Sequence, residues 1–181
     1  SGQLSFNAPQ LKKRNIDPSQ IGINYSQKEN DFDDFSVQLL LPQKQSTKGT
    51  RMAVSDVNGD GLDDFFVGNA LGSSAALYLQ KKDGTFSESN TALWNSEKNY
   101  EDANALFFDA DGDNDKDLYV VSAGYELNAS SPLLQDRLYI NDGKGNFKKN
   151  LEALPVMLVS GKAIAANDID GDGDLDLFVG G

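Results

Sequence analysis

The stretch DIDGDGDLDLFVGG, residues 168–181, places five aspartates on alternate positions with no basic side chain among them. Two carboxylates about 4 Å apart repel each other by roughly 1 kcal/mol in water, and by more in a drier site. Five carboxylates that converge on one point therefore require a cation. A solvated turn whose aspartates point outward is the alternative that this stretch, taken alone, leaves open.

Two more stretches of the same pattern occur upstream. DVNGDGLDD begins at residue 56 and DADGDNDKD at residue 109, so successive starts are 53 and 59 residues apart. All three share aspartate or asparagine at positions one, three, five and nine, glycine at position four, and glycine or asparagine at position six. Glycine and asparagine adopt positive φ most readily, so the chain can curl until alternate side chains meet. This repetition argues against metal-free turns.

The ligand chemistry of these loops predicts calcium. Carboxylate and amide oxygens suit Ca²⁺, and position seven adds a backbone carbonyl in calcium loops of this pitch, whereas Mg²⁺ prefers a stricter octahedron with retained waters. Zinc favours histidine or cysteine, and the chain contains neither. The predicted ligands are Asp56, Asn58, Asp60, Leu62 and Asp64 in the first loop, Asp109, Asp111, Asp113, Asp115 and Asp117 in the second, and Asp168, Asp170, Asp172, Asp174 and Asp176 in the third.

The residues around the loops predict strands. Each loop follows a short apolar run (RMAVS, NALFF, KAIAAN) and precedes another (FFVGNA, LYVVSAG, LFVGG). Runs of β-branched and aromatic residues bounded by glycine are typical of strands. An EF-hand would need flanking helices and a glutamate at position twelve, where this chain has valine. Dockerin-like pairs are excluded for the same two reasons, since they also need flanking helices and an acidic residue at position twelve. Thrombospondin-type acidic repeats would need cysteines, which this chain lacks.

The repeating unit extends beyond the loop. AALYLQKKDGTF (75–86) and DRLYINDGKGNF (136–147) each indicate a strand, a glycine turn and a returning strand. One period then holds about four short strands, the pattern of a propeller blade. We therefore predict an all-β fold of four-stranded antiparallel blades. The predicted units are an irregular segment at 1–24 and a partial propeller at 25–181, with blades at about 49–100, 101–160 and, incomplete, 161–181.

The loops and the strands that follow them resemble the FG-GAP/VCBS repeats of calcium-binding β-propellers, known from integrin α chains and bacterial surface proteins. The loop followed by LFV or LYV, and then the pattern LYxNxGxGxF, carries the resemblance over about residues 49–181. Residues 21–49 are similar to the segment before the first repeat of ASPIC/UnbV-type surface proteins, relatives of cartilage acidic protein. The resemblance implies a seven-bladed ring with one calcium loop between the first two strands of a blade. The chain has no literal Phe-Gly or Gly-Ala-Pro, which favours the bacterial type.

Charge and composition limit the cellular location of the protein and the kinds of partner that it can bind. Half of the 28 acidic residues lie inside the three loops, so the net charge of −12 is almost wholly loop charge. No basic patch remains, which disfavours a nucleic-acid partner. Weak calcium loops fill only near millimolar calcium, outside the cytosol. The chain shows no signal peptide, lipobox or membrane-spanning run, and we expect a mature extracellular or cell-surface protein, for example an outer-membrane lipoprotein of a Gram-negative bacterium.

Two functions stay open at this point. The first is a non-catalytic calcium-binding propeller that binds a protein or a glycan at the cell surface, for instance beside an outer-membrane transporter. The second is a propeller module of a larger extracellular carbohydrate-active enzyme whose catalytic residues lie outside this chain. Without histidine the chain has no usual catalytic triad and no imidazole base, so we expect no enzyme activity from it. We expect the remaining blades from the same longer chain; assembly of several chains into one ring is the alternative.

Four further features of the sequence lead to separate predictions. The insertion 125–135 interrupts the repeat and is a candidate binding loop. Trp94, Tyr100 and Tyr125 could stack on a sugar, although we expect most such aromatic residues in the core. Glu101 and Asp102 are expected to form a solvated strand start. Asn58 replaces a ligand carboxylate and should make the first loop the weakest site.

Overall fold

The computed structural model describes residues 15–28, 31–37, 39–40, 42, 51–124 and 126–181. The first sheet contains β1 (Met52–Ser55), β2 (Asp64–Val67), β3 (Ala76–Gln80) and β4 (Phe86–Ser89). The second contains β5 (Glu101–Phe108), β6 (Asp117–Ala123), β7 (Arg137–Asn141) and β8 (Phe147–Asn150). The third contains β9 (Ala163–Asn167) and β10 (Asp176–Gly180).

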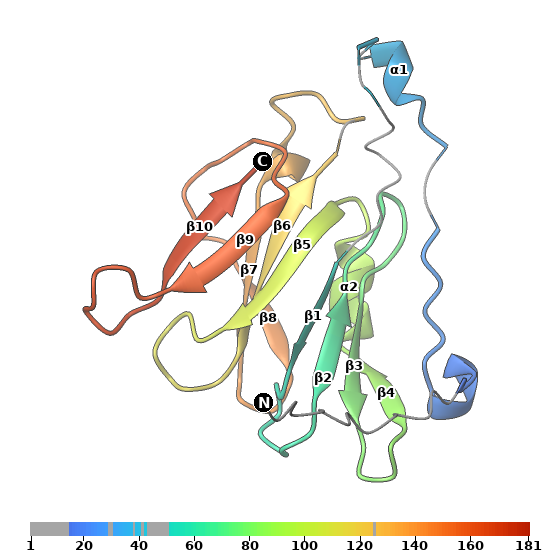
Figure 1. The fold of residues 1–181 in the computed structure, drawn as a ribbon, viewed down its shortest axis with the longest axis vertical. Helices are drawn as coiled ribbons and strands as arrows, with labels where there is room; N and C mark the ends of the chain where they lie inside the picture. The colour runs from blue at the N-terminus through green and yellow to red at the C-terminus, as the bar shows by residue number, and fades with distance from the viewer. Residues whose placement is uncertain (1–14, 29–30, 38, 41, 43–50, 125) are drawn as a thin grey trace, which may run out of the picture.

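Both four-stranded sheets are antiparallel meanders in which the strands follow one another in sequence order. The 75–86 and 136–147 segments form the predicted hairpins, with Gln80 paired to Phe86 and Asn141 to Phe147. In every sheet one acidic loop joins the first strand to the second, and the three loops project from the same ends of the sheets (Figure 1). The prediction of an all-β fold with four-stranded antiparallel sheets is confirmed.

The three sheets lie side by side, with the first strands β1, β5 and β9 next to one another (Figure 1). Side chains of β6 alternate between the two interfaces, as the two-residue period of a strand requires. Leu118 and Val120 join the core shared with the first sheet, whereas Tyr119 and Val121 join the core that reaches the third. β6 is buried along its whole length, which explains the apolar run at residues 118–121.

The first core is centred on aromatic contacts between sheets. Trp94, which is 1% exposed, packs edge-on against Phe66 of the first sheet and Tyr139 of the second. It lies on the short helix α2 (Thr91–Ser96), which the sequence analysis did not predict. Of the aromatic residues considered above as sugar-stacking candidates, Trp94 is therefore a core residue.

Three further short helical segments surround the sheets. They are η1 (Pro18–Ile21), α1 (Asp34–Val37) and η2 (Pro132–Leu134). Tyr25 ties the N-terminal segment to the first sheet, because its hydroxyl donates to the Gly68 carbonyl at 2.6 Å. Of the predicted irregular segment 1–24, residues 1–14 lie outside the described residues, and η1 occupies part of the rest. None of the helices in the described ranges has the length and apolar character needed to cross a lipid bilayer.

Candidate metal centres

The backbone of each loop curls at two residues with left-handed conformations. Position four has φ of +73° at Gly59, +82° at Gly112 and +78° at Gly171. Position six has φ of +83° at Gly61, +72° at Asn114 and +99° at Gly173. Glycine adopts these angles without steric cost, and asparagine does so more readily than most residues that have a Cβ, so these two residue types permit this path. The predicted curl is confirmed in all three loops.

The aspartate at position one closes each loop onto itself. In the first loop (56–64), the Asp56 carboxylate accepts the N–H of Gly59 at 2.8 Å and of Gly61 at 2.8 Å. Asp109 and Asp168 accept the corresponding two N–H groups in the second loop (109–117) and the third loop (168–176). These bonds hold one carboxylate at the centre of the curl, where a cation would be bound.

The aspartate at position nine joins the loop to its sheet. Asp117 is fully buried; one of its oxygens accepts the Ala110 N–H at 2.9 Å and the other accepts the Asn141 N–H from β7 at 2.8 Å. Asp64 makes the matching bonds with Val57 and Gln80. Burial raises the pKa of both carboxyl groups, their backbone hydrogen bonds oppose this rise, and neighbouring loop carboxylates add to it. A cation beside these two aspartates would offset that unfavourable burial of charge.

Positions one, three and nine converge in two of the three loops. Asp109, Asp111 and Asp117 each offer one oxygen, and these oxygens lie within 4.8 Å of one another. Asp168, Asp170 and Asp176 form the same arrangement in the third loop. The described residues of the first loop contain no such group of three acids, since its third position is Asn58, whose side-chain oxygen accepts the Asp60 N–H at 3.0 Å.

The predicted ligands at positions five and seven lie outside these converging groups. The position-five carboxylates of Asp60, Asp113 and Asp172 instead accept the N–H of the residue two positions later. Position seven (Leu62, Asp115 and Asp174) was predicted to supply a backbone carbonyl, and that role stays a prediction. The Asp115 side chain is half-buried, and burial together with the charges of Asp113 and Asp117 raises its pKa to about 6.

The residues present fit a hard divalent cation. Three carboxylates converge in the second loop, with backbone N–H groups orienting two of them. Within the described ranges, the ion pairs involve Glu97, Asp102, Arg137 and Lys149, none of which lies in a loop. Mutual repulsion of the loop carboxylates is thus not relieved by these ion pairs, and an oxygen-coordinated ion such as Ca²⁺ would relieve it.

The predicted solvent exposure of Asp102 is wrong. Asp102 is 2% exposed and accepts a short hydrogen bond from the Arg137 guanidinium, as well as the Asn69 N–H at 2.9 Å. Arg137 also lies 4.1 Å from the centre of the Tyr100 ring and is buried. A buried carboxylate requires such a partner, and here the partner comes from another strand of the same sheet.

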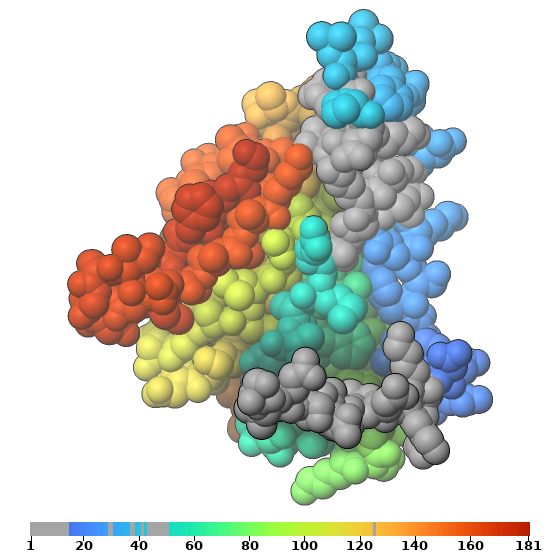
Figure 2. Space-filling view, viewed as in Figure 1, coloured from blue at the N-terminus to red at the C-terminus, as the bar shows by residue number. Residues whose placement is uncertain are grey.

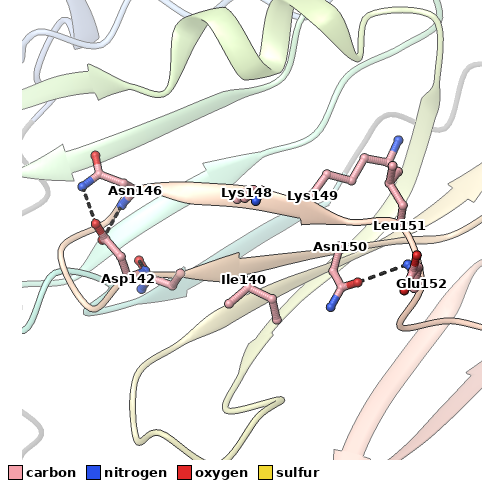
Figure 3. Close-up of a pocket in the computed structure, with 9 residues that line it drawn as sticks. Ile140, Asp142, Asn146, Lys148, Lys149, Asn150, Leu151 and Glu152 are labelled. Carbon is pink, nitrogen blue, oxygen red and sulfur yellow. Dashed lines mark hydrogen bonds between the residues drawn. The ribbon is translucent and has the colours of Figure 1, made fainter.

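Two hollows lie along β7 and β8 of the second sheet. One, of about 580 Å³, follows the β7–β8 hairpin, where Ile140 and Asn150 project to the same side (Figure 3). The other, of about 410 Å³, lies at the end of the sheet away from the acidic loop and is lined by Tyr100, Arg137 and Leu154. Pro132 and Gln135, at the end of the insertion 125–135, also line this second hollow. Tyr125 lies outside the described residues.

The third loop differs from the other two in its exposure. It projects from the body of the molecule together with β10 (Figure 2). Its position-nine residue Asp176 is exposed, although its carboxylate still accepts the Ile169 N–H at 3.0 Å. Its converging geometry thus forms without the burial found at Asp64 and Asp117.

We expect calcium to leave the first loop before the other two. Asn58 supplies a neutral oxygen where the other loops supply the carboxylates of Asp111 and Asp170, so the first loop should bind several-fold more weakly. Crystals equilibrated at graded calcium concentrations, with each site followed by anomalous scattering, measure the order of loss. A first loop that stays filled after the third has emptied would contradict this charge argument.

Comparison with protein families gives one match. A family model described as FG-GAP-like repeat matches residues 56–120 and, a second time, residues 109–179. The two matches together cover more than half of the chain, and each begins at the first aspartate of an acidic loop. No curated protein matches the chain significantly.

Proposed function

Because the chain belongs to the family of FG-GAP-like repeats, we propose that it is part of a seven-bladed β-propeller that uses calcium to stabilise its blades and binds a protein or glycan at the cell surface. The four-stranded sheets and the repeated loops support the propeller architecture. In this proposal the third sheet is the start of a further blade. The ASPIC/UnbV-type bacterial surface proteins remain the proposed subgroup.

The observation that carries the calcium proposal is the convergence of three carboxylates in each of two loops. Asp109, Asp111 and Asp117 would bind one ion, and Asp113 with the Asp115 carbonyl would complete its oxygen shell. The ion neutralises carboxylates that otherwise repel one another at the junction of two strands. Each loop joins the first two strands of its sheet, so we assign calcium a structural role.

We propose no catalytic role for this chain. Position-one and position-nine aspartates already accept backbone N–H groups with both oxygens in the first two loops. Carboxylates held in this way are poorly placed to exchange protons with a substrate, and the chain has no histidine to act as a base. The proposed ligand is therefore bound and released unchanged.

The proposed binding region is the end of the second sheet where Pro132 and Gln135 of the insertion line the hollow beside Tyr100 and Arg137. This hollow combines an aromatic ring, two cationic side chains and apolar residues, a composition suited to a protein or glycan surface. Loops on a rigid sheet scaffold commonly carry binding function. A cell-surface location, where calcium is near millimolar, agrees with both the proposed calcium binding and the proposed binding of a protein or glycan.

Shortening the insertion tests the proposed binding region. Residues 128–130 are exposed, whereas Leu134 is buried and Gln135 bonds to Pro155 and Met157, so only the exposed tip should be removed. Parent protein and variant are compared on a glycan array and against solubilised surface proteins of the source cells. We expect the parent's ligand to bind the variant at least about tenfold more weakly, equivalent to about 1.4 kcal/mol.

A matched variant changes the exposed β3–β4 turn at Asp83 and Gly84 in the first sheet, which should leave binding unchanged. Equal binding by parent and tip-shortened protein would reject the insertion as the binding loop.

A further inference from the structure

The turn between β7 and β8, residues 142–146, lies between the first and second acidic loops. A Cβ added at Gly145 would lie 3.6 Å from the Cβ of Asn58 in the first loop. A Cβ added at Gly143 would lie 3.2 Å from a carboxylate oxygen of Asp115 in the second loop. One turn of the second sheet therefore contacts both loops, although the loops belong to different sheets.

Asn141, which precedes this turn, connects the two loops by hydrogen bonds. Its side-chain amide donates to the Val57 carbonyl of the first loop at 2.7 Å and to the Lys116 carbonyl of the second at 3.1 Å. Its side-chain oxygen accepts the N–H groups of Asp142 and Gly145 at 2.9 Å and 3.1 Å. Asn141 is 5% exposed, and all four hydrogen-bonding sites of its side-chain amide are used, which fixes the orientation of the side chain.

The bonds of Asn141 lead directly to a predicted ligand in each loop. Its backbone N–H donates to the Asp117 carboxylate at 2.8 Å. On the other side, Val57 accepts from the Asn141 amide and donates its own N–H to the Asp64 carboxylate at 3.1 Å. The position-nine aspartates of the two loops are thus joined through only Asn141 and Val57.

The turn that carries these contacts is itself held in one shape. Asn146 donates to Asp142 from its backbone at 3.2 Å and from its side chain at 2.9 Å, as Figure 3 shows. Asn90, which lies between β4 and α2, donates to the Gly145 carbonyl at 2.7 Å and accepts the Phe147 N–H at 3.1 Å. A shift of the turn at one loop would therefore also change its contacts with the other loop.

We propose that Asn141 couples the first two loops, so that calcium in one raises the calcium affinity of the other. This inference rests on the proposed calcium binding. An ion in the second loop would fix Asp117, which would fix Asn141, the turn and the backbone of Val57, whose N–H orients Asp64. The first loop then loses less conformational freedom when it binds its own ion, and by linkage the effect is reciprocal. Asn141 is in this sense a positioning residue for both sites.

The third loop provides an internal comparison. The hydrogen bonds that its aspartate side chains accept within the described ranges all come from residues 168–176, and none joins it to the other two loops. Disabling the second loop with Asp111→Ala should therefore affect the first loop, whereas Asp170→Ala, the same change in the third loop, should not.

The test is a CaCl₂ titration followed by NMR, with the amide signals of Gly59 and Gly61 reporting on the first loop. In the parent background, Asp111→Ala should weaken calcium binding at the first loop by about fivefold, at the lower end of typical coupling between sites. Asp170→Ala should leave that affinity unchanged. In an Asn141→Ala background, Asp111→Ala should no longer alter the first loop, whereas direct charge effects between the loops would persist. An Asn104→Ala background, which loses the hydrogen bond from the second sheet to the Lys162 carbonyl beside the third, should retain the fivefold effect.

Three results would overturn parts of this proposal separately. Unchanged first-loop affinity in Asp111→Ala would reject coupling, and coupling that survives Asn141→Ala would reject the assigned role of Asn141. A parent protein whose loop signals do not respond to CaCl₂ would instead reject the proposed calcium binding and, with it, the coupling.

Discussion

Removal of calcium from the full-length protein is expected to lower its free energy of unfolding by about 5 kcal/mol. With a dissociation constant of about 0.1 mM and about 2 mM free calcium, each filled site contributes about 1.8 kcal/mol, so three such sites give about 5 kcal/mol before the weaker binding and the coupling of the first loop are counted. This amount is comparable with the net stability of a typical domain, about 5–15 kcal/mol. Thermal unfolding with calcium and with a chelator should therefore give widely separated melting temperatures.

Two controls make this experiment specific for the loops. Magnesium at the same concentration should restore little of the lost stability, because it prefers a stricter octahedron than a flexible oxygen-rich loop provides. Asp170→Ala, in the third loop, should remove one site's share of the calcium effect while leaving the chelated protein nearly unchanged. Superimposable melting curves with calcium, magnesium and chelator would mean that the loops are metal-free turns.

Arg137→Met is expected to destabilise the protein by about 3–5 kcal/mol, because it leaves a buried carboxylate without its cation. The Arg137 side chain is 2% exposed and the Asp102 side chain 1% exposed, so water cannot replace the lost interaction. Met retains most of the apolar volume of the arginine stem, which keeps the cavity contribution small. Urea unfolding at saturating calcium measures the change without interference from the loops.

Lys149→Met is the matched control within the same network. The Lys149 side chain is 20% exposed and pairs with Glu97 at 2.8 Å, so its loss should have an effect of at most about 1 kcal/mol. The double variant Arg137→Met/Asp102→Leu should recover part of the stability, since it removes both buried charges together. Equal losses from Arg137→Met and Lys149→Met would show that burial does not decide the strength of these ion pairs.

The sequence predicted those features that depend on neighbouring residues. Glycine or asparagine at positions four and six specifies a left-handed backbone, and this conformation occurs at Gly112 and Asn114 as elsewhere. Apolar runs around each loop specified the strands, and the Asp-Gly turns specified the hairpins. All of these signals act within about ten residues of the chain, where side-chain identity and local geometry are directly linked.

Features that depend on contacts between distant residues were missed. Asp102 was expected in solvent because its partner Arg137 comes 35 residues later, and nothing near Asp102 in the sequence indicates that partner. The role of Asn141 was missed for the same reason, since Val57 lies 84 residues earlier. An asparagine at the end of the LYIN strand was visible in the hairpin pattern, but its bonds to both loops require the two sheets to be placed side by side.

The position of Trp94 gives the molecule an intrinsic optical reporter. It is the single tryptophan of the chain, it lies between the first two sheets, and its indole N–H donates to the Ser89 carbonyl at 3.0 Å. Fluorescence emission from a buried indole shifts to longer wavelength when water reaches the ring. Far-ultraviolet circular dichroism, by contrast, follows the strands themselves. A red shift that precedes loss of the strand signal would therefore mean that the first two sheets separate while each is still folded. Unlabelled protein is enough to distinguish this separation from the unfolding of either sheet.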